Sequence, residues 1–233
     1  METSSEGFWE DDGKSYISTM TNEGTIIEER WLDSTSAHPL NSIKGMTILH
    51  DYLYFSDNTE LKRCKLSDPS VVEIIALPNA LKLNDLANDG TSVLVTDTAQ
   101  GAIYRVSPDG THTMIKAPAG VNGVTFSAGK YYAVSFTQHE LYEIDETGEK
   151  EPVAFGLADS FTNLDAIEVL KDGSFIVSDL KAHAILHVSA DRSKVTKLAE
   201  CKWAADIGIN ADQTRIFAPG LKTKTVVIYE LSN

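Results

Sequence analysis

The stretch LNDLANDGTSVLVTDTAQGAIYRVSPDGTHTMIKAP, residues 83–118, decides the fold because it contains four short strands separated by turns. Two strands are expected at 83–89 and 91–97, and a hairpin follows at 103–118. Within the hairpin, Gly110 of SPDGT supplies the positive φ that a tight turn requires, and apolar residues alternate with polar ones on both sides. Four antiparallel strands in this order are typical of one blade of a β-propeller.

The same pattern recurs along the chain with a period of about 38 to 45 residues, as expected for propeller blades. Further hairpins are predicted at 16–32, 61–77, 141–156 and 185–200, with a partial copy at 226–233. Pairs of strands precede them at 43–49 and 52–57, 121–126 and 130–136, 164–170 and 174–179, and 205–210 and 214–219. No segment shows helical periodicity, and 33–43 is expected to be an irregular loop. We therefore predict an all-β, six-bladed propeller that forms a single domain over residues 1–233.

Two of the six copies are short of strands. The first copy has only its outer hairpin at 16–32, and the last copy stops after three strands. The first blade is therefore expected to be incomplete at the N-terminus. From ordinary strand lengths, about 25 to 30 residues ahead of Met1 would complete it.

The composition limits the class of partner. The formal net charge of −14 argues against binding to nucleic acid or to an anionic membrane surface. Cys64 and Cys201 are too few for a disulfide framework and are expected to be free thiols. Residues 1–15 contain no signal peptide, which predicts a cytoplasmic protein, or a periplasmic or extracellular one if the N-terminus has been removed. We expect a monomer or homodimer that binds a small-molecule substrate.

Polar side chains begin the innermost strand of five copies, where a buried strand normally has an apolar residue. They are Lys44, Asn84 with Asp85, Asn122, Asp165 and Asp206. These strands start at the central channel, so the side chains should converge there. Burying such groups unpaired costs several kcal/mol each, so a shared cation or a hydrogen-bond network is expected. Oxygen ligands favour Ca²⁺ or Mg²⁺.

A structural interpretation stands beside this one. Asn-Asp and Asn-Gly are common turn dipeptides, so Asn84 and Asn122 could instead belong to turns. Asp57, Asp97 and Asp179 each end a second strand and are expected to cap loops or to bridge blades.

The segments KLNDLA, GVNGVTF, NLDAIEV and AADIGI, in this order and at blade spacing, resemble the SMP-30/gluconolactonase/luciferin-regenerating-enzyme family. The resemblance extends from about Lys14 to the C-terminus. It implies a divalent cation, usually calcium with Mg²⁺, Mn²⁺ or Zn²⁺ as alternatives, held by Asn84, Asn122, Asp165 and a glutamate. Glu6 is the candidate for that glutamate, although the hairpin alignment places it in a loop.

The resemblance implies hydrolysis of a lactone or related ester. The cation would polarise the carbonyl, Asp165 or Asp206 would take a proton from the attacking water, and the substrate would contact Lys82 and Asp85. The alternative is a non-catalytic propeller that binds a ligand or a protein and has a degenerate metal site. A third possibility, C–C bond formation of the strictosidine-synthase type, has no distinguishing residue here.

Overall fold

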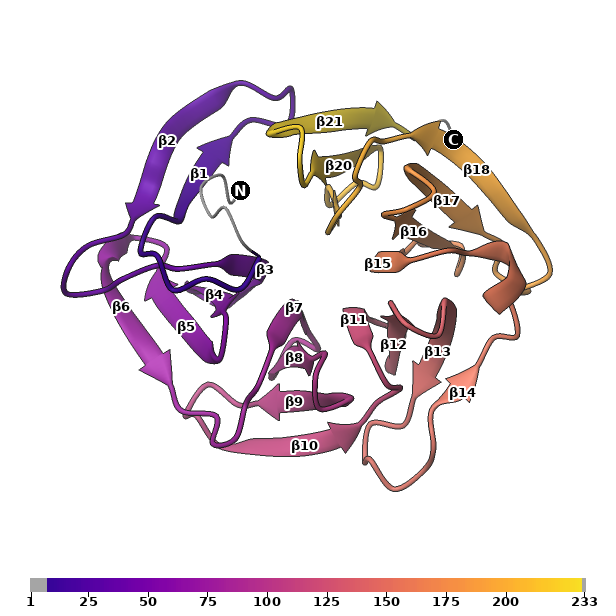
Figure 1. Cartoon of the computed structure of the whole chain (residues 1–233), viewed down its shortest axis with the longest axis horizontal. Coiled ribbons are helices and arrows are strands. Elements are labelled where there is room, and N and C mark those ends of the chain that lie inside the picture. Colours follow the sequence, from indigo (N-terminus) through magenta and orange to yellow (C-terminus); the bar gives the residue numbers. More distant parts are fainter. Residues whose placement is uncertain (1–7, 232–233) are drawn as a thin grey trace.

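Alternating strands and turns fold into a ring of antiparallel sheets in the computed structural model, which describes residues 8–231 (Figure 1). Four sheets have four strands each: β3(Ile43–Leu49)–β4(Tyr52–Asp57)–β5(Glu60–Lys65)–β6(Asp68–Ile75), β7(Leu83–Asn88)–β8(Val93–Asp97)–β9(Ala102–Val106)–β10(His112–Lys116), β11(Val121–Ser127)–β12(Lys130–Ser135)–β13(Glu140–Ile144)–β14(Val153–Ala154) and β15(Leu164–Val169)–β16(Phe175–Asp179)–β17(Ala184–Val188)–β18(Val195–Glu200). A fifth has three strands, β19(Gly208–Ile209)–β20(Arg215–Gly220)–β21(Thr225–Glu230). The hairpin β1(Tyr16–Met20)–β2(Ile26–Asp33) is a two-stranded sheet, and a single 3-10 turn covers Ala158–Ser160.

The all-β propeller is confirmed, but the number of blades differs from the expected six. Five sheets have three or four strands, and the β1–β2 hairpin lies between β21 and the β3–β6 blade (Figure 1). The last sheet has three strands, as expected, and the incomplete first blade stays a prediction. The segment between β2 and β3 is an irregular loop, as predicted.

The hydrophobic core is divided among the interfaces between neighbouring sheets. Each blade interface from the β1–β2 hairpin round to the β19–β21 sheet contains its own cluster of buried apolar side chains. Stacking sheets around a ring in this way buries both faces of each blade. Within residues 8–231, no helix is long and apolar enough to cross a membrane.

The remaining interface, between the β1–β2 hairpin and the three-stranded sheet, is closed by polar contacts. The guanidinium of Arg215 on β20 donates to the Asn22 carbonyl at 2.9 Å and pairs with the Glu23 carboxylate at 3.0 Å. None of the core clusters found among the described residues spans this interface. The ion pair of Arg215 with Glu23 stabilises this contact by about 0–1 kcal/mol, and Ile228 of β21 also packs beside Gly24 of the hairpin.

Both cysteines are buried free thiols, as expected. Cys64 lies on β5 in the cluster beside the β1–β2 hairpin, and Cys201 lies between the β15–β18 and β19–β21 sheets. Burial raises the pKa of the Cys64 thiol to about 11. Both therefore act as small core residues.

Candidate functional site at the axial channel

Each long inner strand is bulged near its start. The pairing register of β7 with β8 shifts between Leu83 and Leu86. The registers of β3, β11 and β15 with their second strands shift between the corresponding residues. A bulge places two residues opposite one on the partner strand and redirects a side chain. The redirected positions include Asn84, Asn122 and Asp165, which explains how polar groups at strand starts reach the channel. Both asparagines lie inside strands, so the turn interpretation is wrong.

A hydroxyl group on the second strand stabilises the bulge in three blades. The hydroxyl of Ser178 accepts the Ala166 backbone N–H at 3.0 Å and donates to the Ala205 carbonyl of the next sheet at 2.7 Å. Ser56 on β4 and Thr96 on β8 accept the equivalent bulge N–H groups. The buried hydroxyl therefore satisfies a backbone donor that the bulge removes from the ladder.

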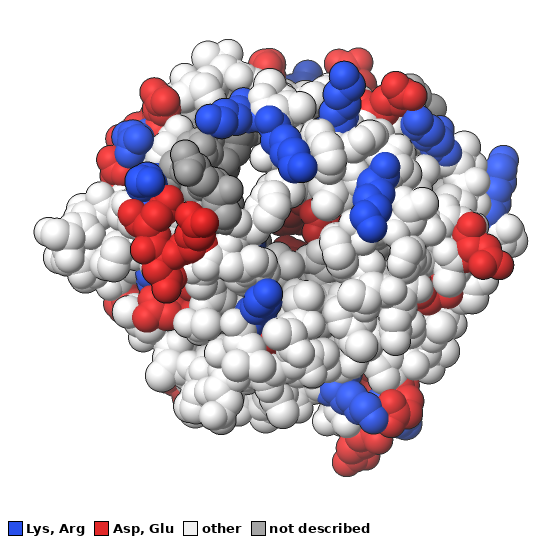
Figure 2. Space-filling view, in the orientation of Figure 1, with Lys and Arg blue, Asp and Glu red and all other residues white. Residues whose placement is uncertain are grey.

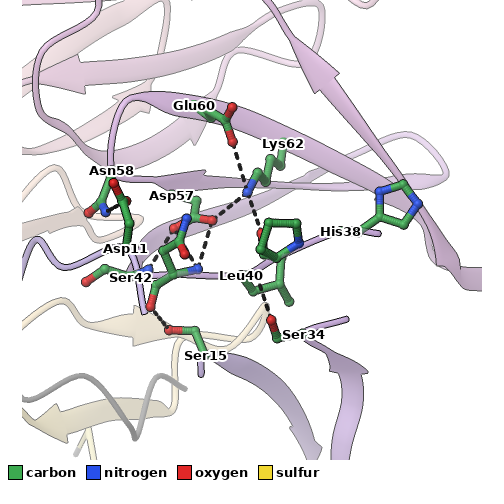
Figure 3. Close-up of polar contacts among 12 residues, drawn as sticks. Asp11, Ser15, Ser34, His38, Leu40, Ser42, Asp57, Asn58, Glu60 and Lys62 are labelled. Atoms are coloured by element: carbon green, nitrogen blue, oxygen red, sulfur yellow. Dashed lines mark hydrogen bonds and ion pairs between the residues drawn. The ribbon is translucent and has the colours of Figure 1, made fainter. Parts of the chain in front are cut away.

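The residue that follows this hydroxyl is the aspartate expected to be structural, and its contacts confirm that role. In Figure 3 the Asp57 carboxylate accepts the Ser42 N–H at 2.7 Å and the Lys62 ammonium at 2.6 Å. Asp97 accepts the N–H groups of residues 81 and 82, and Asp179 accepts that of Thr162 at 2.7 Å. Each aspartate thus fixes the loop that leads into an inner strand.

Small residues allow the inner strands to approach one another. A Cβ atom on Gly123 of β11 would lie 2.7 Å from the Ala166 Cα of β15, and a Cβ on Gly45 of β3 would lie 2.6 Å from the Asp85 Cα of β7. Real Cβ atoms do not come so close to backbone. The channel wall at β3, β7, β11 and β15 is therefore tight, and side chains beside these residues are held close to one another.

The three side chains expected to bind the metal do converge. The Asn84 amide nitrogen donates to Asn122 Oδ1 at 2.6 Å, and the Asn122 amide nitrogen donates to Asp165 Oδ1. These residues come from three different blades. Within residues 8–231, no group donates a hydrogen bond to Asp165 Oδ2. This oxygen can therefore accept one from a ligand or a water molecule. Burial raises the pKa of Asp165 to about 6, and the bond from Asn122 opposes that rise.

Below this chain of hydrogen bonds, a cavity of about 260 Å³ runs along the inner strands. Asp85, Glu168 and Asp206 line it. Both carboxylate oxygens of Asp85 accept backbone N–H groups, from Leu86 at 2.7 Å and from Val124 at 2.8 Å, so this residue bridges β7 and β11. The Lys82 side chain does not line this cavity; it is exposed, and its ammonium lies 5.1 Å from the centre of the Trp9 ring.

Burial and mutual repulsion favour the protonated forms of these carboxyl groups. Burial raises the pKa of Asp85 to about 7, and the charges of Glu168 and Asp165 add to the effect. The pKa of Glu168 rises to about 8 through burial and the charge of Asp206. Burial also raises the pKa of Asp206 well above its usual value, and the charges of Asp85 and Asp165 act in the same direction. Such shifts are common at functional sites.

Sequence reasoning missed Glu168 as a channel residue. Simple alternation from Asp165 would place position 168 on the opposite face, but the bulge between Leu164 and Ile167 changes the register. The Glu168 carboxylate accepts a weak hydrogen bond from Thr125 of β11 at 3.4 Å. An unexpected glutamate three residues after a polar strand start was the signal for this position.

Asn84, Asn122 and Asp165 carry side-chain oxygen atoms of the kind that bind a hard cation, although the Asn122 amide oxygen accepts a hydrogen bond from Asn84 here. Two asparagine amides and the Asp165 carboxylate lie in direct contact, and oxygen donors of this kind suit Ca²⁺. Within residues 8–231 no group of three or more His, Cys, Asp or Glu side chains is placed to hold a metal. A metal here would therefore depend on the amides. Glu6, the expected fourth ligand, lies outside the described residues.

No family model and no curated protein matches the chain, whereas solved structures resemble its fold. A chain of a nidogen/laminin complex has a TM-score of 0.76 and 13% identity, covering 89% of this chain and 82% of that one. A catalytically inactive virginiamycin B lyase from Staphylococcus aureus has a TM-score of 0.66 and 17% identity, covering 92% and 73%. A luciferin-regenerating enzyme has a TM-score of 0.59 and 14% identity, covering 79% and 73%. At these identities the likeness establishes the fold, a β-propeller that also occurs in enzymes.

Proposed function

We propose that this propeller is a hydrolase of lactones or related esters, with its reaction centre at the Asn84–Asn122–Asp165 chain and calcium as its cation. The observation that carries the proposal is the direct contact of these three side chains from separate blades, beside a polar cavity. Solved propellers that include a lyase and a luciferin-regenerating enzyme support an enzymatic role. They also support the resemblance to the SMP-30 group.

The residues divide the chemistry among them. Asn84, Asn122 and Asp165 would hold the cation, which when bound supplies a positive charge for the carbonyl oxygen of the substrate. Asp165 Oδ2 would accept a proton from the attacking water. Asp206, whose pKa is raised well above its usual value, would hold a proton that can be donated to the departing oxygen.

We also infer that the β1–β2 hairpin is the outer pair of a sixth blade. The hairpin lies in the sector between β21 and the β3–β6 blade, with β2 on the outside (Figure 1). The buried side chains of Ile17 and Leu32 pack with the core of the neighbouring blade. Pairing between blades by apolar faces is the ordinary propeller contact.

The second candidate is a non-catalytic propeller that binds a ligand or a protein. The likeness to a chain of a nidogen/laminin complex favours it, because that structure is itself an assembly of proteins. The hydrogen bonds that join Asn84, Asn122 and Asp165 also satisfy these side chains without a metal.

A thermal-shift series with Ca²⁺, Mg²⁺ and EDTA, combined with turnover of a lactone and ester panel, tests the proposal. A ligand that binds only the folded state raises the melting temperature. We expect a rise with Ca²⁺ that Asp165→Asn abolishes, together with the loss of hydrolysis in that variant. An unchanged melting temperature with every ion and no turnover by the parent protein would support the binding module instead. Turnover unaffected by Asp165→Asn would refute the assigned role.

A further inference from the structure

The mouth of the channel carries positive charge on one side. In Figure 2, Lys and Arg side chains stand around the central opening, and Asp and Glu side chains lie within it. Lys44 is the second residue of β3, and Lys82 directly precedes β7 of the neighbouring blade. The entrance to an acidic cavity is therefore locally cationic.

Lys44 occupies the bulge position of β3 that Asn84, Asn122 and Asp165 occupy on the following inner strands. The shift in pairing lies between Ile43 and Met46 on β3, as it lies between Leu164 and Ile167 on β15. Around the ring, the side chains at this level thus change from a cation on β3, through two neutral amides, to a carboxylate on β15. A ligand that spans the channel meets opposite charges on its two sides.

The Trp9 ring lies near both lysines, and the Lys44 ammonium also donates to the Ser42 carbonyl at 3.0 Å. The Lys44 ammonium lies 4.7 Å from the centre of the Trp9 ring, and the Lys82 ammonium lies 5.1 Å from it. Through the shared ring, the two ammonium groups are at most about 10 Å apart. Cation–π contacts stabilise each of them near the ring, although like charges repel. Lys82 is exposed and forms no ion pair with the residues that the structure describes.

The backbone on either side of Trp9 is fixed to the β3–β6 blade. The Ser42 hydroxyl donates to the Phe8 carbonyl at 2.9 Å. The Asn58 amide donates to the Glu10 carbonyl at 3.3 Å and to the Asp11 carboxylate at 2.7 Å, and Figure 3 shows Asn58 and Asp11 side by side. The backbone of Trp9 is therefore fixed by contacts on both sides of it.

From this geometry we infer that Lys44, Lys82 and Trp9 form a subsite for a carboxylate, and that the substrate of the channel is an anionic ester or lactone. The inference rests on the proposed function for the reaction and adds the charge of the substrate. The anionic group binds between the two ammonium groups, on the side of β3 and β7. Its ester group then extends across the channel toward Asn122 and Asp165, where a negative group would be repelled by the carboxylate.

Binding of benzoate tests the subsite separately from any reaction. Benzamide has the same shape without the charge and provides the neutral control. Titrations followed by NMR, in EDTA and without any ester, report binding whether or not the protein has hydrolase activity. We expect benzoate to bind at least tenfold more tightly than benzamide, and its affinity to fall as ionic strength rises.

Matched variants identify the groups responsible. The Lys44→Gln/Lys82→Gln double variant should weaken benzoate binding at least tenfold and leave benzamide unchanged. The control, Lys181→Gln, changes an exposed lysine on another blade and should change benzoate binding less than twofold. Lys82→Arg, which keeps the charge, should retain most of the affinity. Chemical-shift dispersion shows whether each variant is folded.

Three results would overturn the inference: equal affinity for benzoate and benzamide, an equal loss in Lys181→Gln, or undiminished benzoate binding in a folded double variant. Failure of the proposed hydrolysis has a different signature, because benzoate would still bind at the lysines while no ester was turned over. If esters are hydrolysed, the double variant should raise KM for an anionic ester and leave KM for its methyl-capped neutral analogue unchanged.

Discussion

Gly123→Ala tests whether the close approach of inner strands holds the site together. The new Cβ would lie 2.7 Å from both the Ala166 Cα and the Asp165 carbonyl oxygen. Both atoms are backbone, so the contact is relieved only if β11 and β15 move apart by several tenths of an ångström. Overpacking of this kind costs about 1–3 kcal/mol. The φ of Gly123 is not positive, so alanine also restricts the unfolded chain and regains about 0.4–1 kcal/mol.

The net loss is thus between about 0 and 2.6 kcal/mol, and the midpoint of about 1.3 kcal/mol corresponds to a fall in Tm of roughly 3–5 °C for a chain of this size. Gly208→Ala is the matched control, because Gly208 also lines the cavity, has no positive φ, and has no atom within 4 Å of the position that the alanine methyl group would occupy. Its Tm should be unchanged or slightly higher. Both variants are measured by calorimetry under one buffer condition. If Gly123→Ala melts at or above the temperature of Gly208→Ala, the close-packing argument is refuted.

Two further predictions concern buried charge. Lys62→Met leaves the Asp57 carboxylate buried without its ammonium partner, so the free energy of unfolding in denaturant should fall by about 3–5 kcal/mol. Lys116→Met removes one partner of an exposed ion pair and should lower the free energy of unfolding by less than about 1 kcal/mol. Equal losses in the two variants would contradict the importance of the buried pair. Because burial raises the pKa of Glu168 from 4.5 to about 8, the folded state holds a proton that the unfolded chain releases, and stability should decrease as pH rises from about 4.5 to about 8. Glu168→Gln should flatten that part of the Tm–pH profile, and a profile parallel to that of the parent protein would disprove the assignment.

Local patterns in the sequence determined the strands. Alternating residues and turn glycines placed the β7–β10 blade close to its observed bounds, and the repeat predicted the ring of sheets and the three strands of the last sheet. The aspartates that end the second strands were also interpreted correctly, because an aspartate after a buried strand commonly accepts loop N–H groups. These features depend on contacts within one blade, so a short window of sequence contains them.

The site depends on contacts between residues about one blade apart, and these were only partly predictable. Converging strand starts predicted that Asn84, Asn122 and Asp165 would meet. The bulges, which decide whether Glu168 faces the channel, arise from hydrogen bonding across strands and leave no periodic signal. The placement of Trp9 over Lys44 and Lys82 brings together three separate segments. The sequence alone determined which residues form strands, and the tertiary structure decided which side chains share the channel, because register and distance are set only when the blades pack.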